Sequence, residues 1–116
     1  MKKQIIGQQG EVRIIKISEL PEDFERKKVE RIESGFIISH SESGHHHVLT
    51  GGDVMERQSN VPEGMQIFYA ILDNPESFVQ DANSPHGSFK LEPGIYEFRV
   101  SREFDPFAQI ARKVED

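Results

Sequence analysis

The sequence contains no cysteine, which excludes disulfide bonds, thiolate nucleophiles and thiolate metal ligands. It also lacks an apolar run of the roughly 20 residues that a membrane-spanning helix needs. Residues 1–10 have no hydrophobic core of signal-peptide length. These absences predict a cytoplasmic protein without a membrane partner. Apolar residues are scarce as well, at 35%, so we expect a thin core within one β domain over residues 1–116.

Positive charge is also in short supply, because the formal net charge is −6. Proteins that bind nucleic acids usually carry a basic footprint. Cations gather in this chain at residues 26–31, but carboxylates surround them at Glu22, Asp23, Glu25, Glu30 and Glu33. We therefore expect a mixed, solvated surface there, and the charge argues against nucleic acid as a partner.

What the sequence does have is a series of short strand-like runs separated by turn residues. The predicted strands are residues 12–17, 35–40, 45–50, 53–57, 66–72, 77–80 and 95–104. Residues 66–72 are almost continuously apolar, as in a strand buried on both faces. The pattern predicts an all-β fold, a small antiparallel barrel or sandwich with at most one or two short helices, in 19–33 and near 106–113. For residues 22–33, a short helix and an extended surface segment both remain open.

Four of the five histidines lie within residues 39–52. A hairpin loop at residues 41–44 would place His40 opposite His45 and Ile38 opposite His47. A second hairpin, with Gly51 and Gly52 as its loop, would place His47 opposite Glu56. The face formed in this way has an apolar part and a polar part. The apolar part consists of Phe36, Ile38, Leu49 and Val54, and the polar part of His40, His45, His47 and Glu56; His46 points away to the surface.

Three imidazoles and a carboxylate beside an apolar pocket form the ligand set of a zinc or non-haem iron site. Neighbouring side chains on one face start ~5 Å apart, near enough to converge on a metal ~2.1 Å from each ligand. His86, in a turn-rich stretch between two strands, could close over the rim. The alternatives are exposed histidines, a cross-strand charge pair at Glu56, or a one-residue register slip that moves half the set to the other face.

Arg102 continues the apolar face of the last predicted strand, whose inward set is Tyr96, Phe98 and Val100. A buried arginine needs a partner, so Glu42, Glu56 or an anionic ligand is expected beside it. Alternatively, its stem lies along the core edge with the guanidinium in water. Ligating histidines also need a group that holds their second ring nitrogen, and Glu42, Glu56 and Glu103 are the nearest such groups by sequence.

The chain resembles a family of small, largely uncharacterised bacterial and phage proteins. Its members carry a Gly-His-x-His segment, a later His that leads into a Leu-x-Pro-Gly-x-Tyr turn, and a closing Arg-Glu-Tyr-x-Pro. Residues that match are Gly44, His45 and His47 in the first motif, His86, Leu91, Pro93, Gly94 and Tyr96 in the second, and Arg102, Glu103, Phe104 and Pro106 in the third, with Phe in place of Tyr. The family's lead-in to the first motif is shortened here.

This resemblance implies that His45, His47 and His86 act together, but it supplies no activity. A fainter similarity is to cupins, small β-barrels that bind metal through His-x-His, a Glu and a later His, and it is one of architecture alone. Two classes of function remain open. One is a metal-centred enzyme that activates water or dioxygen. The other is a non-enzymatic binding or assembly protein, phage-related, with structural histidines and a homodimer interface at residues 66–72 or the last strand.

Overall fold

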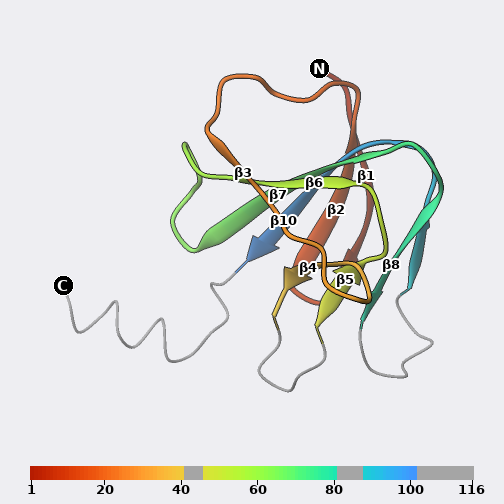
Figure 1. The fold of residues 1–116 in the computed structure, drawn as a ribbon. Coiled ribbons are helices and arrows are strands. Elements are labelled where there is room, and N and C mark those ends of the chain that lie inside the picture. The colour runs from red at the N-terminus through yellow and green to blue at the C-terminus, as the bar shows by residue number, and fades with distance from the viewer. Residues whose placement is uncertain (41–45, 81–87, 102–116) are drawn as a thin grey trace.

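The structure, a computed structural model, describes residues 1–40, 46–80 and 88–101, and in these residues it contains strands and no helix. Ten antiparallel strands form two sheets that pack face to face (Figure 1). The all-β prediction is confirmed. The sheets do not close into a barrel, so the arrangement is sandwich-like. Within residues 22–33 the structure contains the strand β3 and no helix, so the helix alternative there is wrong. The other predicted helix, near residues 106–113, lies outside the described part.

The larger sheet has six strands in the order β1-β2-β10-β7-β6-β3. Their bounds are β1 Lys3–Gln9, β2 Val12–Ile17, β10 Gly94–Ser101, β7 Met65–Leu72, β6 Asp53–Arg57 and β3 Arg26–Lys28. The smaller sheet has the order β4-β5-β8-β9, with bounds β4 Phe36–Ser39, β5 His47–Leu49, β8 Glu76–Gln80 and β9 Phe89–Leu91. Each predicted strand has a counterpart in the structure. Three further strands were not predicted: β1 is largely polar, β3 is wholly charged, and β9 has only three residues.

The core lies between the two sheets. It contains the predicted apolar face, Phe36, Ile38, Leu49 and Val54, and the predicted inward set, Tyr96, Phe98 and Val100. The strand β7 is buried on both faces, as predicted. Phe68 faces the core, while Ile67 and Tyr69 face the outside of the large sheet, where Leu20 and Phe24 cover them. A loop therefore protects the outer face of this sheet from water.

Two predicted strand pairings are wrong. The pair β4–β5 does begin with Phe36 opposite Leu49, but a bulge follows, so that Ser39 rather than Ile38 lies opposite His47. The bulge inserts one extra residue that the partner strand does not match. The second predicted hairpin does not form at all. At residues 51–52 the chain passes from β5 in the small sheet to β6 in the large sheet (Figure 1), so His47 and Glu56 lie in different sheets.

The two sides of the sandwich differ. On one side, Phe89 of β9 packs on Gly7 of β1 so closely that a Cβ built on Gly7 would lie 2.5 Å from the ring. A side chain at position 7 would displace the ring, so glycine allows the close contact between the two sheets there. On the other side lie β3 and β4, each the last strand of its sheet. The chain connects them through residues 29–35 (orange in Figure 1).

The strands expected to form a homodimer, β7 and β10, have hydrogen-bonded neighbours on both sides. Their edges are therefore closed to strand pairing with a second copy, and dimerisation stays a prediction. No helix in the described ranges is long and apolar enough to cross a membrane.

Candidate functional site

Five of the predicted site residues lie outside the described part of the chain. They are His45, His86, Glu42, Arg102 and Glu103, and their predicted roles stay predictions. The three that are described, His40, His47 and Glu56, do not converge. Within residues 1–40, 46–80 and 88–101, no group of three His, Cys, Asp or Glu side chains could hold a metal ion.

His47 is buried, with 2% of its surface exposed. Its ring stacks on Phe78 at a centroid distance of 6.0 Å and an interplanar angle of 18°. Nδ1 lies 2.7 Å from Oε1 of Gln9, and Nε2 lies 3.3 Å from Oε2 of Glu11. Both ring nitrogens therefore face oxygens, one from the last residue of β1 and one from the turn that joins β1 to β2.

The amide of Gln9 fixes the proton on His47. Nε2 of Gln9 donates a hydrogen bond to the Phe78 carbonyl at 3.4 Å, which leaves Oε1 of Gln9 to face the imidazole. Because Oε1 can only accept, Nδ1 of His47 carries a proton and donates it. Burial lowers the pKa of His47 from its ordinary value of 6.5 and outweighs the opposing effect of Glu11. The 3.3 Å separation between Nε2 and Oε2 of Glu11 is long for a charge-assisted hydrogen bond.

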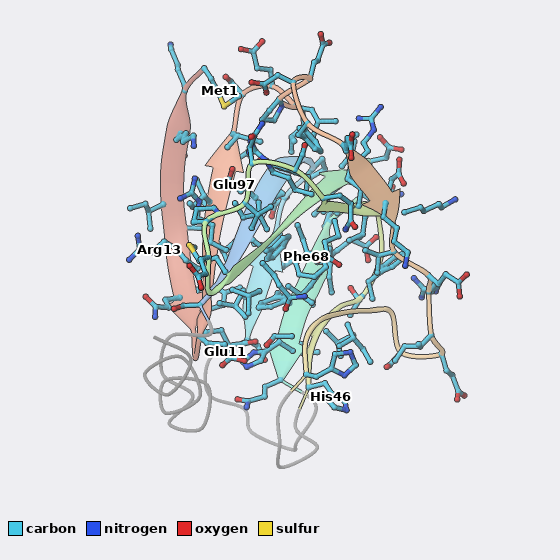
Figure 2. The ribbon with its side chains drawn as sticks, turned by 90° about the vertical axis from the view of Figure 1, so that its left-hand side faces the viewer. Met1, Glu11, Arg13, His46, Phe68 and Glu97 are labelled. Atoms are coloured by element: carbon cyan, nitrogen blue, oxygen red, sulfur yellow. The ribbon has the colours of Figure 1, made fainter. Side chains whose placement is uncertain are left out.

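Glu11 connects this histidine to two further strands. Its Oε1 accepts a hydrogen bond of 2.5 Å from the Ser39 hydroxyl, and its carbonyl accepts one of 3.0 Å from the Ser101 amide. Gly10 beside it has a φ of +55°, and a Cβ there would lie 3.1 Å from Cε1 of His47, so both the backbone conformation and the space favour glycine. We call Gln9, Glu11, Ser39 and His47 the histidine clasp. It ties the β1–β2 turn to the small sheet at one end of the sandwich, where Figure 2 also places His46.

A cavity of about 460 Å³ opens on the side between β3 and β4. Its apolar lining comes from Val29, Ile37, Ile38 and Phe68, and its polar lining from Lys27, Lys28, Glu30, His40, Glu56 and Gln66. The cavity thus brings two predicted metal ligands, His40 and Glu56, to one place and leaves His47 out. The ring of His40 also meets His46 edge-on, with 4.9 Å between centroids.

Strand alternation explains why this cavity has an apolar and a polar part. Val54 and Phe68 project into the core from β6 and β7, and Val29 packs against them just after β3. The side chains two residues away on the same face are polar: Glu56 next to Val54, Gln66 next to Phe68, and Lys27 next to Val29. Glu56 lies opposite Lys27 in the ladder and accepts a hydrogen bond of 3.4 Å from Gln66. The inner face therefore changes from apolar to polar at the same level on three neighbouring segments.

A second buried polar group lies on the outer face of the large sheet, away from both sites. Glu97 is 2% exposed and accepts a hydrogen bond of 2.8 Å from Nε of Arg99, while Nζ of Lys3 lies 3.9 Å away. Arg57 donates to the Tyr69 hydroxyl at 3.1 Å. Burial raises the pKa of Tyr69, and the charge of Glu97 adds to this effect. The network joins four strands across the outer core, which is a structural role.

Sequence reasoning missed the partners of His47. Gln9 is 38 residues away from it in the chain, and nothing in the local pattern of β1 marks either Gln9 or Glu11 as a partner of a histidine. The alternation within β6 and β7 was available in the sequence, and it would have located the polar part of the cavity.

A family model described as a domain of unknown function (DUF8820) matches residues 8–101. The match agrees with the resemblance to an uncharacterised family; it does not test the three motifs, the bacterial or phage origin or the comparison with cupins. No curated protein matches the chain. No solved structure matches it either.

Proposed function

Since the chain belongs to the family described as a domain of unknown function, DUF8820, we propose its function from geometry: it is a non-enzymatic binding domain that takes a ligand in the cavity between β3 and β4. In this proposal His47 has a structural role. The observation that supports this proposal is that His47 and His40 lie in different environments. His47 is buried with both ring nitrogens facing Gln9 and Glu11, whereas His40 lines an open cavity.

The size and lining of the cavity support ligand binding. A volume of about 460 Å³ falls within the range of ~300–1,000 Å³ that is typical of ligand sites. Such sites combine an apolar wall with a few polar groups that orient the ligand. Here Ile38 and Phe68 supply the apolar wall, and Glu56 and Gln66 supply polar groups fixed to each other by a hydrogen bond.

The position of His47 argues against a catalytic role for that residue. A general base must come within hydrogen-bond reach of the substrate proton. His47 is 2% exposed, donates through Nδ1 to Gln9 and turns Nε2 towards Glu11. A substrate would have to displace the β1–β2 turn to reach it.

The test is a screen of small organic molecules against ¹⁵N-labelled protein by NMR. We expect amide shifts to change around Val29, Ile38 and Phe68, which line the cavity. Lys27→Trp, which places an indole over the cavity from β3, should abolish these changes. Lys90→Trp is the matched control, because Lys90 is an exposed lysine of a three-residue strand in the other sheet and does not line the cavity. Shift changes that survive Lys27→Trp would contradict the proposal.

A divalent metal at the mouth of the same cavity is a second candidate. It is favoured by the shared lining of His40 and Glu56 and by the 4.9 Å between the His40 and His46 rings. His45 and His86 would be further ligands. Isothermal titration of tag-free protein with zinc should show stoichiometric binding that His40→Ala weakens, and the affinity should fall as pH drops through ~6.5, where histidines protonate. Equal binding by both proteins would exclude His40 as a ligand.

A further inference from the structure

We infer that the ligand of the cavity between β3 and β4 is an extended peptide segment, which adds as a strand to the open edge of β4. This inference rests on the proposed binding function and names the class of ligand. It starts from the position of β4 at the end of the small sheet, where its one hydrogen-bonded strand neighbour in the described part of the chain is β5.

The hydrogen bonds of β5 show which backbone groups of β4 point outwards. The amide of Thr50 donates to the Ser77 carbonyl of β8 at 3.0 Å. Successive residues of an antiparallel strand direct their N–H and C=O groups to opposite sides, so Leu49 faces β4. Its partner Phe36 then faces β5, and Ile37 directs its N–H and C=O away from the sheet. Ile37 lines the cavity, so within the described part of the chain these groups face a space that a peptide strand could enter.

The opposite wall is less suited to strand pairing. By the same alternation, Val29 donates to Val54 of β6, so the backbone groups of Lys28 point away from the large sheet. However, β3 has only three residues, all charged and exposed. Short, lysine-rich edges are the usual means by which proteins discourage strand addition. We therefore assign the pairing to β4 and treat β3 as the facing wall.

The other side of the sandwich does not offer the same space. There the end strands β1 and β9 meet through Phe89 on Gly7. Between β3 and β4, by contrast, the cavity separates the two strand edges. A peptide strand needs both an unpaired edge and room for side chains on the inner face, and the β3–β4 side provides both.

The layering of the cavity predicts the peptide's side chains. In a strand paired with β4, alternate residues project inwards. One inward side chain would meet the apolar layer at Ile38, Val29 and Phe68. The inward side chain two residues away would meet the polar layer, where Lys27, Glu56 and Gln66 offer both donors and acceptors. The expected ligand is thus an extended segment with an apolar residue and, two positions away, a polar residue that forms hydrogen bonds.

The test begins with a phage-displayed library of random heptapeptides selected on the immobilised full chain. We expect enriched sequences with the apolar-x-polar pattern, whose synthetic peptides shift the amide signals of Ile37 and Ile38. Methylating the peptide amides that face β4 should weaken binding roughly tenfold or more at each position, because each removes a backbone hydrogen bond.

A variant of β4 provides the matching change on the protein. Ile37→Pro removes the outward N–H without removing a hydrogen bond of the β4–β5 ladder, and edge strands tolerate proline at such positions. Ile37→Val keeps the N–H and is the control. Peptide binding should fall with proline and persist with valine. Peptides that bind but tolerate methylation at every amide would overturn strand addition, and this measurement stands even if Ile37→Pro fails to fold. Small molecules that bind in the cavity while no peptide is enriched would overturn this inference and leave the proposed function standing. If neither small molecules nor peptides bind, both the strand-addition inference and the proposed binding function are wrong.

Discussion

The histidine clasp makes a quantitative prediction about His47→Phe. Phenylalanine keeps an aromatic ring stacked on Phe78 but removes the Nδ1–H that donates to Gln9 at 2.7 Å. Gln9 is 4% exposed, so this hydrogen bond is lost in a buried site, which costs ~1–3 kcal/mol. Glu11 is 30% exposed and can turn to water, so it adds little. We expect the free energy of unfolding to fall by about 2 kcal/mol.

Urea denaturation followed by circular dichroism measures this change, provided that the m value is unchanged. A double-mutant cycle separates the polar contact from packing. Gln9→Met removes the acceptor, so His47→Phe should be less destabilising in that background, with a coupling energy of about 1 kcal/mol. His40→Phe, at an exposed histidine, should stay within about 0.5 kcal/mol of wild type. If His47→Phe also stays within that margin, or if the cycle shows no coupling, the clasp does not hold the turn.

Two further predictions concern titration and the outer network. The pKa of His47 lies below its unfolded value of 6.5, so its neutral form contributes stability that is fully present above pH 6.5 and is lost as pH falls towards the folded pKa. Denaturation at a series of pH values should therefore show wild type losing stability relative to His47→Phe on acidification below pH 6.5, and a gain would refute the assignment of a neutral ring. Arg99→Met removes the 2.8 Å donor to buried Glu97 and should lower the free energy of unfolding by about 2 kcal/mol. Arg13→Met, at an exposed arginine opposite Arg99 in the ladder, should change it by less than about 0.5 kcal/mol, and equal losses would show that Glu97 does not depend on Arg99.

Hydrophobic patterns along the chain were enough to locate the strands that carry them and the faces that those strands bury. The run at residues 66–72 predicted a doubly buried strand, and β7 is one. Alternation selected Phe36, Ile38, Leu49 and Val54 for the core, and all four are there. These predictions succeed because side-chain direction in a strand has a period of two and needs no knowledge of the partner strand.

How those strands pair depends instead on contacts between distant parts of the chain. A pair of glycines after a short strand fits a hairpin as well as a crossing between sheets, and the packing of β5 against β8 selects the crossing. The bulge in β4 is likewise invisible in its sequence, yet it sets Ser39 opposite His47. The clasp depends on Gln9 and Glu11, which precede His47 by more than 30 residues. Local patterns fix which side of a strand is apolar; contacts between residues far apart in the chain arise only when the sheets pack, and it is that packing which separates His47 from the cavity that holds His40 and Glu56.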